Sequence, residues 1–169
     1  MHDVMPLDSS NSPRAYIAEN FSFMYEDLPI HGGWGYTKTD ACIIDRSDPA
    51  AGPYEGFDGL GVERAFVEAR ICLEFTDTRP EGERFYGLEW RLLKQELVGL
   101  EAGTYDYLVF EITGIPERSW EPIRDEYWGP DGCCSPDFDE AVHQAKRDAV
   151  SLKSQREFWF EISSFFGRT

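Results

Sequence analysis

Histidine is the side chain of this sequence best suited to chemistry near neutral pH, and the first to consider is His31. It opens the segment HGGWGY, residues 31–36, whose three glycines allow backbone turns that other residues avoid. We expect this segment to form a turn-rich junction between two strands. His31, Trp34 and Tyr36 are therefore candidate binding residues.

The catalytic motifs that such residues could serve are missing. An esterase with HGGW as its oxyanion loop would also need a nucleophile elbow, G-x-S-x-G, and the chain has none. Residues 59–64 begin like a dinucleotide fingerprint, but Arg64 stands where the third small residue belongs and a loop precedes them. The sequence therefore assigns no catalytic residue and no cofactor. Whether the chain is an enzyme stays open, and the absence of motifs favours a non-enzymatic protein.

The cysteines and the other histidines indicate no metal site. Cys42 and Cys72 lie in apolar runs, where a thiol behaves as a small hydrophobic group. Cys133 and Cys134 are adjacent, so a disulfide between them would be strained, and only His143 is near them. We expect His143 on the polar, solvated side of a helix.

Charge is the strongest anomaly of the composition. The 32 acidic and 16 basic residues give a net charge of −16, which opposes binding to nucleic acid and to anionic membranes. A basic protein partner suits this field better. The N-terminus has no apolar core of a signal peptide, and no stretch is long enough to span a membrane. We therefore expect a cytoplasmic protein of unknown oligomeric state.

Aromatic residues in loops are the second candidate site. Trp120, Tyr127 and Trp128 lie in residues 116–136, which contain four prolines and read as a long excursion, with at most a short helical turn at 123–127. Large aromatic side chains in loops often anchor interfaces. They could equally fold back over a sheet.

Alternating apolar residues predict mostly β-structure. A chain of 169 residues suits one domain, and we expect a flexible tail at 1–12 and a single α+β domain at 13–169. The expected strands are 15–25, 41–44, 63–76, 85–90, 92–100, 105–115 and 158–162.

Three of these assignments have helical alternatives. Ser12-Pro13 could instead start a short helix, and residues 62–77 and 91–98 could be strand or helix. For 92–100 a hairpin with the following strand is favoured.

One helix is clearly indicated, at about 138–153. Its apolar residues recur every three or four positions, and Asp137 is the expected N-cap. The fold class predicted is α+β, a mainly antiparallel sheet with this amphipathic helix packed on it and a C-terminal strand.

Two functions follow as hypotheses. The first is an acidic interaction domain, such as an inhibitor or immunity-type protein, that binds a basic protein partner. The alternative is a small-molecule-binding protein or enzyme with a pocket formed by loops 30–36 and 116–136. The two differ in whether these loops meet around a cavity.

Overall fold

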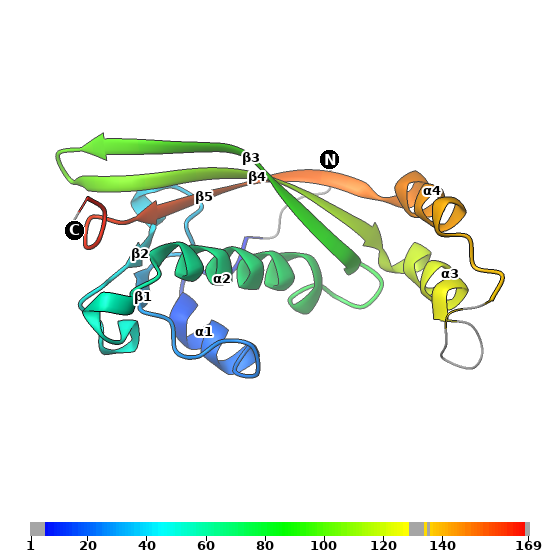
Figure 1. The fold of residues 1–169 in the computed structure, drawn as a ribbon, viewed down its shortest axis with the longest axis horizontal. Coiled ribbons are helices and arrows are strands. Elements are labelled where there is room, and N and C mark those ends of the chain that lie inside the picture. Colours follow the sequence, from blue (N-terminus) through cyan, green and yellow to red (C-terminus); the bar gives the residue numbers. More distant parts are fainter. Residues whose placement is uncertain (1–5, 129–133, 135, 168–169) are drawn as a thin grey trace.

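The structure is a computed structural model that describes residues 6–128, 134 and 136–167. The elements follow in the order α1 (Pro13–Asn20), β1 (Ile30–Gly32), β2 (Cys42–Ile44), α2 (Gly59–Cys72), β3 (Phe85–Leu100), β4 (Gly103–Pro116), α3 (Glu117–Trp128), α4 (Glu140–Val150) and β5 (Leu152–Glu161). Figure 1 shows α2 lying along the sheet and α3 and α4 together at one end.

The sheet has the strand order β1-β2-β5-β4-β3. β2 runs parallel to β5, and all other neighbouring strands are antiparallel. β3 and β4 form the expected hairpin, which confirms strand over helix for 91–98. The α+β class, the mainly antiparallel sheet and the C-terminal strand are confirmed.

The prediction of a strand at 63–76 is wrong, because these residues belong to α2 and a π-helical turn at Leu73–Asp77. The buried residues of α2 include Glu63, Phe66 and Arg70, at helical spacing. Two of these are charged, so an apolar pattern could not show the buried face. α2 supplies much of the core that the sheet covers.

The strand predicted at 15–25 is also wrong. Ser12 caps α1 by accepting a hydrogen bond from the N–H of Ala15, and Pro13 occupies the first turn. Ile17 and Phe21 are buried four residues apart, which fits one face of a helical turn as well as it fits alternation. The weighed alternative, a short helix, is correct.

The excursion predicted at 116–136 contains a full helix, α3, with Pro122 inside it. The helix predicted at 138–153 is α4, which is shorter at both ends. Asp139, rather than the expected Asp137, caps α4 by accepting a hydrogen bond from the N–H of Val142 at 3.0 Å. α4 packs against α3 and the end of β4, while α2 covers the centre of the sheet.

The predicted tail at 1–12 is described only from Pro6. Leu7 is buried in the core, and its N–H donates to the hydroxyl of Tyr36 at 2.9 Å. Over the described residues no helix is long and apolar enough to cross a membrane. Cys42 is a buried free thiol and Cys72 a half-buried one, whereas Cys133 lies outside the described residues.

A buried ion network joins α2 to β5. Arg70 donates from Nε to one oxygen of Glu74 at 2.7 Å, and Arg156 donates from Nε to the other at 2.8 Å. The second end of the Arg70 guanidinium donates to the carbonyls of Trp34 and Glu157, both at 3.0 Å. Because Arg70 and Glu74 are 1% exposed and Arg156 is 5% exposed, the network is shielded from solvent. Its charges meet through hydrogen bonds, which are strengthened by the charges.

Two further carboxyls are buried between α2 and the sheet. Glu63 is 4% exposed, and burial, followed by the nearby Asp106, raises its pKa to about 8. Asp106 on β4 accepts a hydrogen bond from Gln95 at 2.7 Å, and burial raises its pKa as well. The folded protein therefore binds protons here that the unfolded chain releases.

Replacing Glu74 with glutamine should strongly destabilise the fold. Removing one partner of a buried ion pair costs about 3–5 kcal/mol, because the remaining charge stays buried. At about 2–4 °C per kcal/mol, thermal melts should show the Tm of Glu74→Gln lowered by roughly 6–20 °C. Glu19→Gln, on the exposed side of α1, is the control and should change the Tm little. Equal Tm values for the two variants would contradict the role of the network.

Replacing Glu63 with glutamine should stabilise the protein at alkaline pH. Between the unfolded pKa of about 4.5 and the folded pKa of about 8, stability falls as pH rises, because only the folded state keeps the proton. Glu63→Gln removes this loss, so its Tm should exceed that of the wild type increasingly from about pH 5.5 to about pH 8.5. The exposed Glu81→Gln serves as control, and a Tm difference independent of pH would refute the raised pKa.

Candidate functional site

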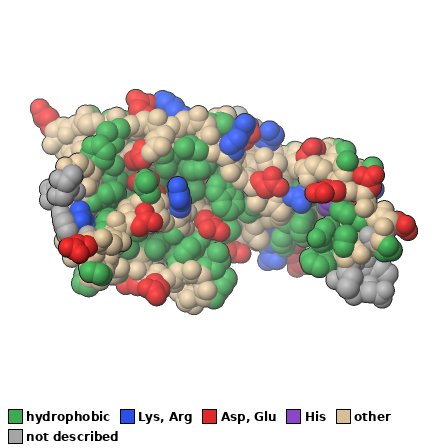
Figure 2. Space-filling model, in the orientation of Figure 1, with side chains coloured by type: hydrophobic (Ala, Val, Ile, Leu, Met, Phe, Trp, Pro, Cys, Tyr) green, Lys and Arg blue, Asp and Glu red, His purple; other side chains and the backbone are tan. Residues whose placement is uncertain are grey.

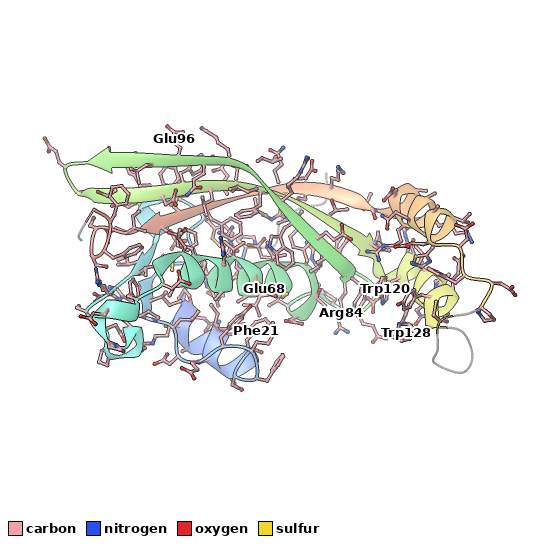
Figure 3. The ribbon with its side chains drawn as sticks, in the orientation of Figure 1. Phe21, Glu68, Arg84, Glu96, Trp120 and Trp128 are labelled. Carbon is pink, nitrogen blue, oxygen red and sulfur yellow. The ribbon has the colours of Figure 1, made fainter. Side chains whose placement is uncertain are left out.

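The six binding residues predicted from the sequence lie in two separate places. His31, Trp34 and Tyr36 are on and after β1, the short edge strand of the sheet. Trp120, Tyr127 and Trp128 are on α3, at the far end of the molecule (Figures 1 and 3). The structure thus does not bring loops 30–36 and 116–136 together around one pocket.

Trp34 is part of the core. It is 1% exposed, its ring meets Tyr16 edge-on at 6.2 Å and Phe66 at 6.0 Å, and its Nε1 donates to the carbonyl of Asp8 at 3.3 Å. His31 is exposed on β1, opposite Ile43. The glycine-rich segment therefore places a tryptophan in the interior.

Tyr36 belongs to the buried ion network. Its hydroxyl donates to Glu74 at 2.8 Å, and its ring lies 3.9 Å from the guanidinium carbon of Arg70. Burial, and next the charge of Glu74, raise the pKa of Tyr36 to about 12. These contacts give Tyr36 a structural role.

The second group lines a pocket between α3 and α4. α3 continues directly from β4, and its first residue, Glu117, accepts a hydrogen bond from the N–H of Gly82 at 2.6 Å. One turn later Trp120 stacks on Tyr86 of β3 at 5.9 Å. α4 leads through Ser151 into β5, so both helices are fixed to neighbouring strands.

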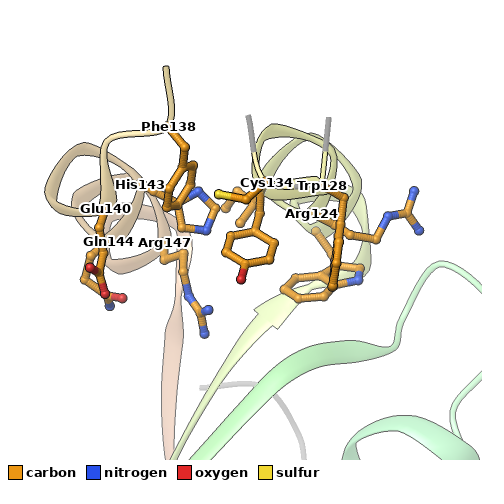
Figure 4. A pocket seen from close by; sticks show the side chains of 11 residues that line it. Arg124, Trp128, Cys134, Phe138, Glu140, His143, Gln144 and Arg147 are labelled. Carbon is orange, nitrogen blue, oxygen red and sulfur yellow. The ribbon is translucent and has the colours of Figure 1, made fainter. Parts of the chain in front are cut away.

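Four large aromatic side chains, Trp120, Tyr127, Trp128 and Phe138, line this pocket, which has a volume of about 560 Å³ (Figure 4). Tyr127 meets Trp128 edge-on at 5.0 Å and Phe138 edge-on at 5.2 Å. The full lining is Trp120, Ile123, Arg124, Tyr127, Trp128, Cys134, Phe138, Glu140, His143, Gln144 and Arg147. The predicted loop aromatics are thus brought together, by a helix.

His143 is the buried polar group of the pocket, and the expectation of a solvated histidine is wrong. Its side chain is 9% exposed, and its ring lies 4.9 Å from that of Phe138 and 6.1 Å from that of Tyr127. Its Nδ1 has no hydrogen-bond partner among the described residues; the nearest carboxylate oxygen, of Glu126, is 3.8 Å away. The aromatic rings, which the polar pattern of α4 did not reveal, remove this histidine from solvent.

The two arginines that line the pocket form ion pairs with exposed carboxylates. Arg147 donates to Glu89 at 3.0 Å, and Glu89 is 68% exposed. Arg124 donates to its neighbour Asp125 and points away from the space between the helices (Figure 4). Ion pairs as exposed as these contribute little energy, so a ligand could replace them.

Sequence reasoning missed the α4 side of the pocket, although a signal was present. Glu140, His143, Gln144 and Arg147 follow the spacing i, i+3, i+4, i+7, which places four polar side chains on one face. Because polar faces usually meet water, only the position of α3 shows that this face lines a cavity.

In the part of the chain that the structure describes, no group of three His, Cys, Asp or Glu side chains could hold a metal ion. What the pocket offers is stacking on rings, one buried imidazole nitrogen and the guanidinium of Arg147. Such a set binds and orients a ligand.

Comparison of the chain with protein-family models, with curated proteins and with solved structures gives no significant match.

Replacing Gly87 with alanine should disturb the base of the pocket. Gly87 has a φ of +56°, and an added Cβ would lie 3.0 Å from the ring of Trp120. A side chain at positive φ costs about 1–2 kcal/mol, so Gly87→Ala should lower the Tm by roughly 2–8 °C and alter the near-UV circular dichroism of tryptophan. Gly99→Ala, in open space on the same strand, is the matched control. Identical spectra for both variants would contradict this packing.

Proposed function

We propose that this protein binds a small organic anion with a flat ring in the pocket between α3 and α4. The observation that carries the proposal is a cavity of about 560 Å³ in which aromatic rings surround the buried His143. Ligand sites typically measure about 300–1,000 Å³ and combine apolar walls with a few placed polar groups. This proposal keeps the small-molecule hypothesis of the sequence analysis. Its pocket, however, uses α3 and α4 and does not include loop 30–36.

The aromatic side chains that line the pocket favour a ligand with a flat ring. Trp120, Tyr127 and Trp128 on α3 and Phe138, just before α4, line the pocket with their rings. Aromatic pairs contribute about 0.5–1.5 kcal/mol each beyond the area that they bury. A flat ring between them gains this attraction at several faces at once.

A polar group on the ligand follows from His143. A buried nitrogen without a hydrogen bond costs about 1–3 kcal/mol, because it has lost its water without replacement. Nδ1 of His143 is such a nitrogen among the described residues. Nδ1 lies 3.8 Å from a carboxylate oxygen of Glu126, so a polar ligand group removes this cost when it displaces that carboxylate or turns the imidazole toward itself.

The negative charge of the ligand follows from Arg147. Arg124 points away from the space between the helices, so Arg147 is the cation that remains there, and it lines the pocket together with Glu140 in a chain of net charge −16. The guanidinium of Arg147 suits a carboxylate, which it can bind through two parallel hydrogen bonds. Its present partner, Glu89, is exposed and replaceable.

The net charge favours a second candidate function, binding of a basic protein partner. The two carboxylates of Asp27 and Asp48 already hold the guanidinium of Arg14 at the surface, as they could hold that of a partner. This function requires association that weakens steeply between low and moderate salt, whereas stacking in the pocket changes less.

Three indole compounds that differ in charge test the pocket. We expect indole-3-acetate to bind more tightly than neutral indole-3-acetamide, and cationic tryptamine to bind most weakly, in calorimetric or NMR titrations. The order reflects Arg147, since the ring is the same in all three. Tightest binding of tryptamine would refute the anion, and binding of none would refute the proposed function.

Two variants should separate the contributions of ring and charge. Trp128→Ala should weaken all three compounds roughly three- to tenfold, because it removes a stacking surface. Arg147→Gln should remove only the advantage of indole-3-acetate, about tenfold, because a charge-assisted hydrogen bond is lost. Trp90→Ala, on β3 outside the pocket, is the matched control and should leave all three affinities unchanged.

A further inference from the structure

β3 is the last strand of the sheet, and the outer side of its 16 residues has no neighbouring strand among the described residues. A long free edge is a template for pairing with another chain. The opposite edge, β1, has only three residues. Pairing along β3 would therefore engage the one long edge of the sheet.

The register of β3 against β4 shows which side chains share a face, because directly opposite residues point the same way. Leu97, Gln95 and Leu92 lie on the face that α2 covers further in. Their opposite residues on β4 are Asp106, Leu108 and Phe110. Asp106 and Leu108 are buried, and Phe110 is half-buried against the core.

Lys94 and Glu96 lie on the other face of the sheet, opposite Val109 and Tyr107. Figure 3 shows Glu96 on the side of β3 away from α2. The pairing skips Leu93, so a bulge at this residue separates Leu92 from Lys94.

The apolar side chains of this edge are uncovered. Leu92 is 44% exposed and Leu97 is 50% exposed, because α2 packs further in, under β4 and β5. Hydrophobic side chains gather along the face between β3 and α2 (Figure 2). Exposed apolar side chains in a contiguous patch mark an interaction site.

The charge along β3 differs from that of the chain. Its charged residues are Glu89, Arg91, Lys94 and Glu96, which cancel, whereas the chain carries −16. β3 is therefore a place where two copies can approach without an excess of facing carboxylates.

We propose that β3 pairs antiparallel with β3 of a second copy, about a two-fold axis at Gln95. Residues directly opposite each other on paired strands lie on the same face of the sheet. A two-fold axis perpendicular to the sheet therefore passes midway between one residue and the same residue of the second copy. With Gln95 there, Lys94 of each copy faces Glu96 of the other copy.

The bulge completes this register. Leu93 is the extra residue of the bulge and has no partner across the strands. The paired residue next to Lys94 is therefore Leu92, which lies opposite Leu97 of the second copy. Two leucine pairs then cover each other on one face, and two opposite-charge pairs form on the other. The edge is complementary to itself in both charge and hydrophobicity.

Salt concentration distinguishes this dimer from binding to a basic partner. Two copies of net charge −16 repel each other, and the repulsion is screened beyond about 8 Å at physiological ionic strength. The dimer should therefore dissociate as salt is lowered. A complex with a basic partner tightens under the same change.

Sedimentation velocity of the full chain, from low to high micromolar concentration, tests the proposal. We expect a reversible monomer–dimer equilibrium. Lys94→Glu and Glu96→Lys should each weaken it about tenfold, because each places like charges opposite each other at two positions. Both side chains are more than half exposed. Within one chain they pair with each other at 2.6 Å, a surface ion pair whose loss costs little, so the fold of each variant should persist.

Charge exchange supplies the decisive controls. The double variant Lys94→Glu/Glu96→Lys should regain the wild-type dimer, and an equimolar mixture of the two single variants should form a heterodimer. Leu97→Lys should be monomeric, whereas Leu60→Lys, at an exposed leucine of α2, should dimerise normally.

Two results would overturn the proposal. One is a wild-type chain that stays monomeric at high micromolar concentration. The other is a dimer whose affinity neither single charge variant changes.

Discussion

The arrangement of the core depends on one buried carboxylate, that of Glu74. Its two oxygens accept hydrogen bonds from Arg70 on the same helical segment, from Arg156 on β5 and from Tyr36 after β1. Buried charges are tolerated only when they are paired with good geometry, so these segments have one compatible arrangement. The backbone carbonyl of Glu74 also accepts a hydrogen bond from Arg79. The helix, the central strand and the glycine-rich segment are thereby fixed together.

This network also explains why the candidate site lies elsewhere. The residues around Trp34 and Tyr36 hold the core together through hydrogen bonds, and neither side chain lines the pocket between α3 and α4. α3 and α4 instead extend from β4 and β5, whose packing is anchored by Phe110 against Phe158 at 5.6 Å. Helices that are directly connected to well-packed strands give a site a rigid base. The interior, the pocket and the free edge of β3 therefore lie in separate parts of the molecule.

The sequence predicted part of this fold, and it named three of the residues that line the pocket. The hairpin of β3 and β4 was predictable because its residues are β-formers around a Gly-containing turn, and α4 because its spacing and acidic first turn are helical. α2 was not, since its buried face includes the charged residues Glu63 and Arg70 and thus resembles a polar face. The sequence identified Trp120, Tyr127 and Trp128 as candidates because they are large aromatic residues. His143 was missed, because its burial comes from rings on another helix.

The sequence by itself determined the class of the fold, the absence of recognisable catalytic motifs and the excess of negative charge, because composition and local periodicity are properties of the chain alone. Only the tertiary structure decided which charged residues are inside and which aromatic residues meet. Arg70 and Glu74 can be buried because Arg156, distant in sequence, pairs with the same carboxylate. Likewise the polar face of α4 lines a pocket only because β4 and β5 are neighbours and bring α3 beside it. Long-range pairing of this kind leaves no mark on local spacing.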